Sequence, residues 1–112
     1  MKYEDMSDFE INGRVGKIVF KLEGKEFRTK NPMNNVVEFI TGFGDEREFK
    51  YFNGCNSPSD ACPIIFDNRI TVTPYEDENQ GWFATYDTSF FIDHENPLRA
   101  AMICFLKMKD AE

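Results

Sequence analysis

The chain has 112 residues, of which 41% are hydrophobic and 15% aromatic, and it carries a net charge of −7 at neutral pH. This length favours one domain with one core, and the aromatic content excludes a disordered chain. The negative charge disfavours direct binding to nucleic acid, because it repels the phosphate backbone.

The first predicted element is a helix that begins at Ser7. Ser7 and Glu10 have the spacing of a capping box, in which each side chain accepts a hydrogen bond from the other residue's backbone N–H. Apolar residues then recur at helical spacing up to a stop at Gly24. They are Ile11, Val15, Ile18, Val19 and Leu22. A hairpin over residues 19–27 that turns at Gly24 is the alternative.

The middle of the chain predicts a β-hairpin followed by a short helix. Residues 36–40 (VVEFI) and 48–52 (EFKYF) are rich in strand-forming residues and are separated by a turn that contains glycines. Ser57 and Pro58 then provide an N-cap and a proline at the first helical position. This helix should run to about Phe66.

A second strand pair and a C-terminal helix complete the chain. Residues 69–73 alternate in polarity, and residues 82–86 are their predicted antiparallel partner across an acidic loop. Asn96 and Pro97 begin the last helix. Its main apolar face is formed by Leu98, Ala101, Met102, Phe105 and Met108. The predicted fold is α+β, a small antiparallel sheet flanked by an N-terminal helix, a short middle helix and a C-terminal helix.

The last helix has a second apolar side, because Ile103 and Leu106 fall opposite its main face. A helix at the surface of a small monomer needs only one such face. Either residues 20–52 of the same chain cover this side, or a second subunit or partner does, which makes Ile103 and Leu106 a candidate interface. Cover by residues 20–52 is favoured, since that segment has apolar side chains of its own to bury.

Four stretches stand out as motifs: SDFEIN at 7–12, CNSPSDACPIIFDNRITV at 55–72, Trp82 with Ala84, and NPLRAAMICFLKM at 96–108. In order and spacing they resemble the motifs of the NinX-like family of small phage and prophage proteins. The matching positions are Asp8, Asn12, Cys55, Asn56, Asp60, Pro63, Ile70, Trp82, Asn96, Pro97 and Arg99. The resemblance implies a single domain over residues 1–112, with a divergent segment at about residues 20–52. It does not identify any catalytic residues in this chain.

The resemblance also implies a phage or prophage gene expressed in the cytoplasm of a bacterial host. The sequence agrees with that compartment. Residues 1–10 are acidic where a signal peptide would be basic, and the longest apolar run, residues 100–106, is too short to span a bilayer. An odd number of scattered cysteines is typical of free thiols in a reducing compartment.

Neither a metal site nor a catalytic centre is predicted. Cys55, Cys62, Cys104 and His94 lack the close pairs of a zinc site, and the loop position of His94 does not suit a base for a thiol nucleophile. The acidic run at residues 76–78 lacks the alternating ligands of a calcium loop. We therefore expect no cofactor.

Arg99 breaks a local rule, because a cation in the first turn of a helix opposes the helix dipole. The first interpretation is that Arg99 pairs with a carboxylate inside the fold, with Asp93, Glu95 and Asp60 as the candidates. The second is that Arg99 and the free amides of the helix start bind an anion or a partner's carboxylate, in a pocket also lined by Asn56 and Asp60.

Three functions remain open. The first is a non-enzymatic accessory protein that binds a host or phage protein and modulates host metabolism or defence. The second is an acidic DNA mimic that inhibits a DNA-binding enzyme, with carboxylates at Glu23, Glu26, Asp45, Glu46, Glu48 and Glu76 to Glu78. The third is a small anion- or nucleotide-binding domain or enzyme centred on Arg99. We expect no direct contact with nucleic acid or membrane, and a homodimer is left open.

Overall fold

The structure is a computed structural model that describes residues 2–22, 28–31, 35–42, 44–87 and 90–112. Its helices are α1 (Asp8–Val19), α2 (Pro58–Asp67) and α3 (Pro97–Asp110). The first antiparallel sheet has the strand order β1 (Arg28–Asn31), β2 (Val36–Thr41) and β3 (Glu48–Phe52). The second has the order β4 (Thr71–Pro74), β5 (Trp82–Tyr86) and β6 (Phe90–His94). Short 3-10 turns are formed by Tyr3–Asp5, Gly44–Glu46 and Glu78–Gln80.

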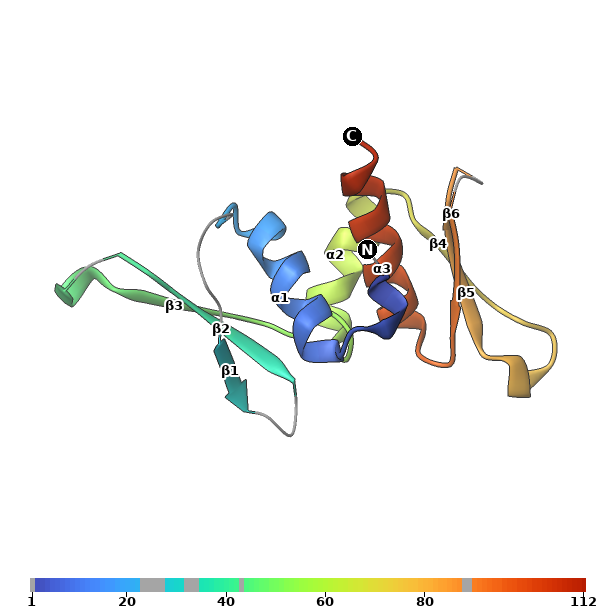
Figure 1. The fold of residues 1–112 in the computed structure, drawn as a ribbon, viewed down its shortest axis with the longest axis horizontal. Helices are drawn as coiled ribbons and strands as arrows, with labels where there is room; N and C mark the ends of the chain where they lie inside the picture. Colours follow the sequence, from blue (N-terminus) through green and yellow to red (C-terminus); the bar gives the residue numbers. More distant parts are fainter. Residues whose placement is uncertain (1, 23–27, 32–34, 43, 88–89) are drawn as a thin grey trace.

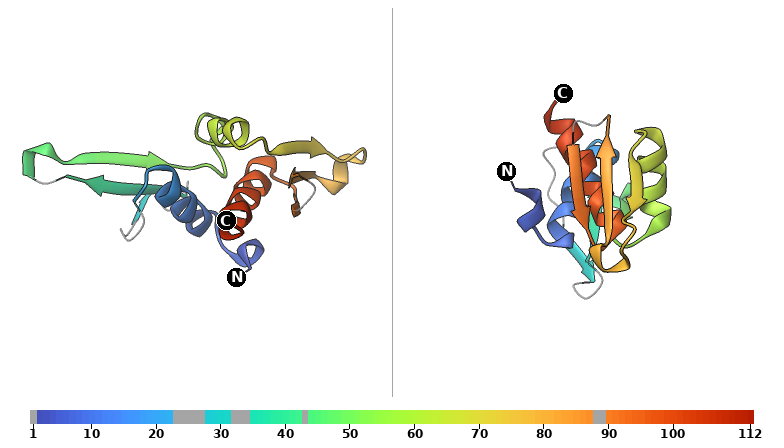
Figure 2. Two further views of the ribbon diagram at one scale, coloured as in Figure 1. Left: turned by 90° about the horizontal axis from the view of Figure 1, so that it is seen from above. Right: turned by 90° about the vertical axis from the view of Figure 1, so that its right-hand side faces the viewer.

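Helix α3 is the central element of the molecule, which measures 52 × 32 × 25 Å. Helices α1 and α2 lie on one side of α3, and the second sheet lies on the other (Figure 1). The first sheet packs against α1, so the two sheets occupy opposite ends of the long axis (Figure 2). The predicted α+β class is confirmed, but the strands form two separate sheets where one was predicted.

Helix α1 begins at the predicted N-cap. The hydroxyl of Ser7 accepts a hydrogen bond from the N–H of Glu10 at 3.2 Å, and Ile11 is fully buried. Gly16 weakens the helix relative to alanine, but a Cβ there would lie only 2.7 Å from Cε2 of Phe39 on β2. The glycine therefore allows α1 to pack closely on the first sheet.

Helix α1 ends at Val19, earlier than the stop predicted at Gly24. Lys21 follows the helix with a left-handed φ of 58°. The N–H of Leu22 donates to the carbonyl of Lys17 at 2.7 Å, which is the longer hydrogen bond of a Schellman motif and terminates the helix. Gly24, as the stop and as the turn of the alternative hairpin, lies outside the described residues.

Strands β2 and β3 form the predicted hairpin. Val37 pairs with Phe52, and Ile40 pairs with Phe49. Val37 and Phe52 are buried, whereas Phe49 is exposed. Strand β1, which pairs with the other edge of β2, was not predicted, because residues 28–31 (RTKN) are polar and show no alternation.

Helix α2 begins at Pro58 as predicted and ends at Asp67, one residue beyond the predicted end. Ser57 occupies the N-cap position, but its side chain makes no capping hydrogen bond. Its hydroxyl instead lies 3.0 Å from the hydroxyl of Ser59. Near the C-terminal end of this helix, Phe66 projects into solvent.

The second sheet contains the predicted pair of β4 and β5, in register from Thr71 opposite Thr85 to Pro74 opposite Trp82. Strand β6 pairs with the other edge of β5 and was not predicted. Its sequence, FFIDH, opens with three apolar residues in a row, and so short a run does not distinguish a strand from a buried helix segment.

Helix α3 is apolar on both sides and is covered on both sides. Ile103 and Leu106 are 1% and 2% exposed. The prediction that the chain itself covers the second apolar side is therefore confirmed. The covering segment differs from the predicted one. The second sheet, α1 and α2 pack around α3, while β2 and β3 pack on α1. On the side of Ile103 and Leu106, the N-terminal turn Tyr3–Asp5 is bound to Arg99, Lys107 and Asp110.

Candidate functional site

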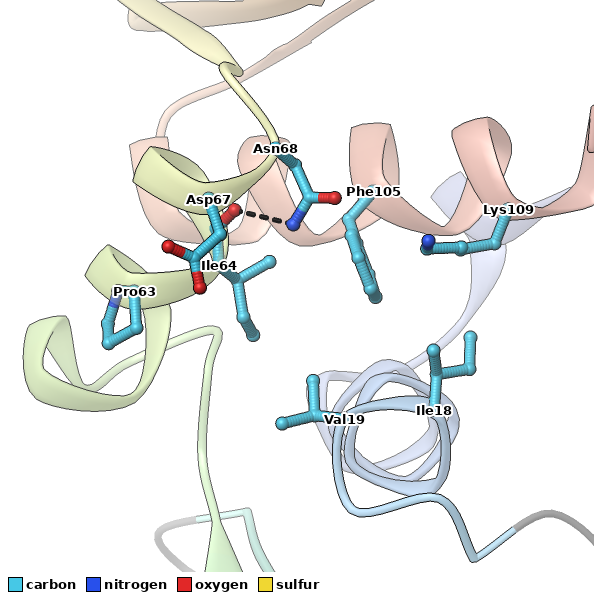
Figure 3. Close-up of a pocket in the computed structure, with 8 residues that line it drawn as sticks. All are labelled: Ile18, Val19, Pro63, Ile64, Asp67, Asn68, Phe105 and Lys109. Atoms are coloured by element: carbon cyan, nitrogen blue, oxygen red, sulfur yellow. Dashed lines mark hydrogen bonds between the residues drawn. The ribbon is translucent and has the colours of Figure 1, made fainter.

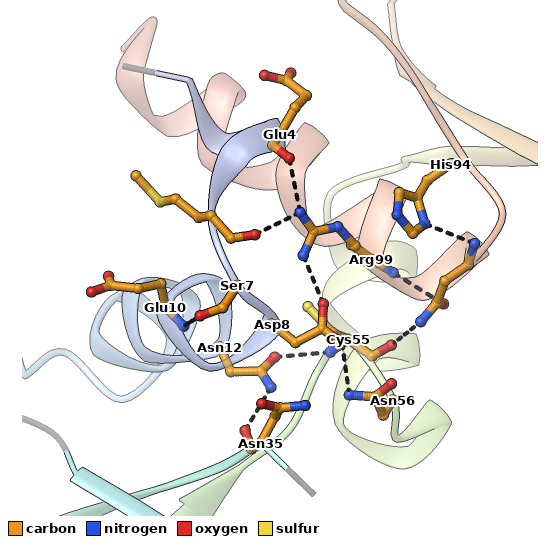
Figure 4. A network of polar contacts seen from close by, with 12 residues as sticks. Glu4, Ser7, Asp8, Glu10, Asn12, Asn35, Cys55, Asn56, His94 and Arg99 are labelled. Atoms are coloured by element: carbon orange, nitrogen blue, oxygen red, sulfur yellow. Dashed lines mark hydrogen bonds and ion pairs between the residues drawn. The ribbon is translucent and has the colours of Figure 1, made fainter. Parts of the chain in front are cut away.

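The N-terminal ends of all three helices converge, and polar side chains fill the space between them (Figure 4). We call this cluster the polar junction. It consists of Asp8, Asn12, Asn53, Cys55, Asn56, Asp60, Asn96 and Arg99. Helix N-termini carry partial positive charge, so the carboxylates of Asp8 and Asp60 in the first turns of α1 and α2 lie where a negative charge is stabilised.

Arg99 lies at the centre of the polar junction and is 7% exposed. Its Nη1 donates to Oδ1 of Asp8 at 2.7 Å, forming an ion pair. Its Nη2 donates to the backbone carbonyls of Met6 at 2.7 Å and Glu4 at 3.1 Å. Arg99 thus fixes the N-terminal segment to α3, and its positive charge is compensated by Asp8.

The predicted partners of Arg99 were wrong, although its pairing with a carboxylate was predicted. Asp93 accepts a hydrogen bond from the hydroxyl of Tyr75 at 3.4 Å. Asp60 accepts one from the N–H of Asn53 at 2.9 Å. Glu95 is exposed just before α3, where the chain is already turning into the helix.

Asn12 connects α1 to the turn that precedes α2. It is fully buried, and its Oδ1 accepts a hydrogen bond from the N–H of Cys55 at 2.9 Å. Its Nδ2 donates to Oδ1 of Asn53 at 2.8 Å and to the carbonyl of Asn35 at 3.0 Å. Asn53 Oδ1 also accepts from Nδ2 of Asn56 at 3.0 Å. The turn at residues 53–56 is therefore fixed by side-chain amides.

Asn96 connects the same turn to α3. Its Oδ1 caps the helix by accepting from the N–H of Leu98 at 2.9 Å and of Arg99 at 3.3 Å, and its Nδ2 donates to the carbonyl of Cys55 at 2.7 Å. The N–H of Asn96 donates to Nδ1 of His94 at 2.9 Å, which fixes the imidazole at the start of α3.

The structure brings the predicted site residues Arg99, Asn56 and Asp60 into one network. Asn56 Nδ2 donates to Oδ2 of Asp8 at 3.3 Å, while Arg99 Nη1 donates to the other oxygen of the same carboxylate. The anion that faces Arg99 and Asn56 is thus the protein's own Asp8. The arrangement can hold three segments of the chain together, and it contains no nucleophile and base in contact among the described residues.

An apolar groove lies between the helices at some distance from the polar junction (Figure 3). Its cavity volume is about 280 Å³. It is lined by Ile18, Val19, Pro63, Ile64, Asp67, Asn68, Phe105 and Lys109. Asn68 is fixed at its edge, because its Nδ2 donates to the carbonyl of Ile64 at 2.8 Å.

The family described as "Bacteriophage P22, NinX" matches the chain over residues 2–109. The chain belongs to the NinX family. The resemblance seen in the motifs is therefore confirmed, and the match also spans residues 20–52. No curated protein and no solved structure was found to match the chain.

The polar junction contains most of the positions that matched NinX motifs. Asn53 is a residue of the polar junction that does not lie at a motif position, and it was not singled out from the sequence. Two features of the sequence indicate residues of the polar junction. Asn12 places an amide beside Ile11 on the apolar side of α1, and Asn96 occupies the N-cap position of α3. Their hydrogen bonds to Cys55 were not predictable, because they span 43 and 41 residues.

The cysteines of this NinX protein are free thiols in different environments. Cys55 and Cys104 are fully buried, whereas Cys62 on α2 is half-buried. Burial raises the pKa of the Cys104 thiol to about 11 and that of Cys55 still further. Among the described residues, no group of three metal-ligating side chains is close enough to hold a metal ion.

We expect thiol titration to count three free cysteines in denaturant, and only Cys62 to react quickly in the folded protein. The thiolate is the reactive form, and burial disfavours it at Cys55 and Cys104. Reaction rates with a thiol reagent, measured with and without denaturant, check this. A denatured count below three, or stoichiometric zinc in protein purified without chelator, would contradict the prediction.

Two surfaces of the described chain carry exposed aromatic side chains on strands. On β3, Phe49 and Tyr51 are 48% and 45% exposed. On β6, Phe91 is 58% exposed, and its ring stacks on that of Phe83, which contacts Tyr75 in turn. Among the described helices, none has the length and apolar character needed to cross a bilayer.

Proposed function

We propose that this NinX-family protein is an accessory protein of a phage that acts in the cytoplasm of the bacterial host by binding another protein, and so modulates host metabolism or defence. The observation that supports this best is the hairpin of β2 and β3, which projects from the helices at one end of the long axis (Figure 1). Its exposed aromatic residues, Phe49 and Tyr51, are of the type enriched at protein interfaces.

The outer face of the hairpin indicates the chemistry of the partner. Phe49 and Tyr51 alternate with Lys50 on β3, so they share the face turned away from the core. At the tip of the same hairpin, the exposed acids Asp45, Glu46 and Glu48 outnumber one exposed base, Arg47. The complementary surface is an apolar recess with lysine or arginine at its rim.

Neither of the other two hypotheses gains a supporting observation. A DNA mimic needs a continuous acidic stripe, but Asp45 and Glu46 lie at one end of the long axis, and the β4–β5 loop with Glu76 and Asp77 lies at the other (Figure 1). Glu23 and Glu26 lie outside the described residues. An anion site at Arg99 would have to displace Asp8 from its ion pair at 2.7 Å.

Affinity capture with a hairpin variant tests the proposal. The tagged parent should retain a specific protein from infected or uninfected host cells, and the double variant Phe49→Ser, Tyr51→Ser should lose it. Both replaced side chains are largely exposed, so the fold should be little affected. Quantitative mass spectrometry of the captured proteins is the measurement.

Phe91→Ser is the control, because it removes an exposed phenylalanine, 58% against 48% for Phe49, from the opposite end of the molecule. It should retain the same protein as the parent. Capture that is unchanged by the hairpin variant, or lost equally in both variants, would contradict the assignment of the hairpin as the binding surface.

A further inference from the structure

The second sheet has one face on α3 and one face turned to solvent. Ala84 and Ile92, which lie opposite each other on β5 and β6, are buried, and α3 packs on this sheet. Side chains alternate along a strand, so the residues next to these two point the other way. We call this side the outer face; it is turned toward the viewer, in front of the helices, in the right-hand view of Figure 2. It consists of Thr71, Thr73, Phe83, Thr85, Phe91 and Asp93.

A row of aromatic rings crosses the outer face. The ring of Phe91 on β6 stacks on that of Phe83 on β5, with centroids 4.9 Å apart and planes inclined by 22°. The ring of Tyr75, which directly follows β4, lies 5.1 Å from that of Phe83. One side of the Phe91 ring is thus against Phe83, and the side chain is still 58% exposed. The row therefore ends in an open aromatic face, to which a cation is attracted.

A carboxylate lies beside this row. Asp93 stands directly opposite Phe83 in the register and follows Phe91 by two residues on β6, so the three side chains share the outer face. Asp93 is exposed, and its Oδ2 accepts a hydrogen bond from the hydroxyl of Tyr75 at 3.4 Å. Because a carboxylate has about four acceptor positions, Asp93 can accept further hydrogen bonds from a donor above the sheet.

The charge of this part of the chain is one-sided. Residues 70–98, which contain the whole second sheet, have six acidic residues and no lysine or arginine. They carry −6 of the net charge of −7, while the rest of the chain has the remaining 14 of the 20 acidic residues and all 13 basic ones. A local excess of negative charge attracts a cationic partner and repels nucleic acid and anionic membranes.

We propose that the outer face of the second sheet binds an arginine-bearing segment of a partner protein. The guanidinium stacks on the open face of Phe91 and donates to the carboxylate of Asp93. Arginine suits this pair better than lysine, because its planar group stacks on an aromatic ring and presents a fork of donors to a carboxylate. The outer face and the hairpin of β2 and β3 lie at opposite ends of the long axis (Figure 1), so this is a second binding surface, independent of the hairpin.

Fluorescence anisotropy of a labelled peptide of alternating arginine and glycine, titrated with the purified full chain, tests the proposal. A lysine–glycine peptide of the same length and charge should bind the parent more weakly. Phe91→Leu keeps an apolar side chain but removes the ring, and it should weaken binding of the arginine peptide by about two- to fivefold. Phe91→Trp should bind at least as tightly as the parent, because tryptophan is the best ring for this contact. Asp93→Asn should weaken binding by a factor similar to that of Phe91→Leu.

Two control variants lie at the opposite end of the molecule. Phe49→Leu removes an exposed phenylalanine ring from β3, and Glu48→Gln removes an exposed carboxylate from the same strand. Both should bind the arginine peptide like the parent, because at physiological ionic strength charges act over only about 8 Å. Circular dichroism should show that all the variants remain folded.

Several results would overturn the proposal. A parent that does not bind the arginine peptide, or binds both peptides equally, rules out the stacked guanidinium, as does Phe91→Leu with the affinity of the parent. If Glu48→Gln weakens binding as much as Asp93→Asn, the peptide responds only to net charge. If spermidine binds the parent and the arginine peptide does not, the occupant is a small polycation. If the parent forms a dimer that Phe91→Leu disrupts, the outer face is occupied by a second copy and the proposal is wrong.

Discussion

Replacing Ile103 and Leu106 together by serine is expected to unfold most of the protein at room temperature. Both side chains are almost completely buried in α3, the element around which the rest of the chain packs. Loss of one large buried aliphatic side chain typically costs about 2–5 kcal/mol. The total stability of a domain this size is about 5–15 kcal/mol. Urea denaturation followed by far-ultraviolet circular dichroism measures the loss.

Phe91→Ser is a matched control for this pair. It makes the same kind of change at an exposed position. It should lower the free energy of unfolding by only about 1 kcal/mol, the value of its ring stacking on Phe83. The two replaced residues are neighbours on the helix, so the losses in free energy of unfolding of the two single variants need not add up to the loss of the double variant. A double variant as stable as the parent would mean that α3 is not covered as described, and that Ile103 and Leu106 face another molecule.

The cover of α3 shows where sequence reasoning succeeded and where it failed. The helical period alone places Ile103 and Leu106 opposite the main face, so the need for a second cover was predictable. The identity of the cover was not. Residues 20–52 were favoured because of their apolar content. Instead, the N-terminal turn is bound to Arg99 and Lys107 on that side, and the second sheet packs on α3. Half of the strand pairs of this sheet depend on β6, which has no alternating pattern.

The starts of the helices were predicted well because they depend on residues that are close together in the sequence. The Ser7 N-cap, the Pro58 start of α2 and the Asn96 cap depend on residues within one helical turn, and all three helices begin as predicted. The end of α1 was missed because a Schellman motif usually takes glycine at its left-handed position, and here the chain places Lys21 there.

Contacts between distant segments were not predictable in the same way. The unfavourable position of Arg99 in the first turn of α3 correctly indicated a compensating carboxylate. Its partner is 91 positions away, at Asp8, whereas the candidates were Asp93 and Glu95, close by in sequence, and Asp60 through space. A sequence shows that a charge needs compensation, but the fold decides which carboxylate provides it.

Arg99→Met is expected to lower the free energy of unfolding by about 3 kcal/mol, near the lower end of the cost of breaking a buried ion pair. The methionine fills similar space but donates nothing to Asp8, Met6 or Glu4. The carboxylate of Asp8 loses its cation, and two carbonyls lose their donor. Arg99→Lys should recover only part of the stability, because one ammonium group cannot reproduce the planar guanidinium that contacts all three acceptors. Thermal and urea denaturation measure both effects.

Asp8→Asn separates the ion pair from the rest of the network. Asparagine keeps one acceptor for Arg99 but removes the charge, and its amide NH2 group cannot accept from Asn56 as the second carboxylate oxygen does. The buried guanidinium then lacks a counter-charge, so the cost should also be about 3 kcal/mol. The double variant Arg99→Met, Asp8→Asn should then lose less than the sum of the single variants, since Arg99→Met no longer leaves an unpaired carboxylate at residue 8. If Arg99→Met were instead as stable as the parent, the polar junction would not be held by Arg99. The interpretation of Arg99 as the site for an external anion would then be favoured, because a cation not needed for stability would be free to serve binding.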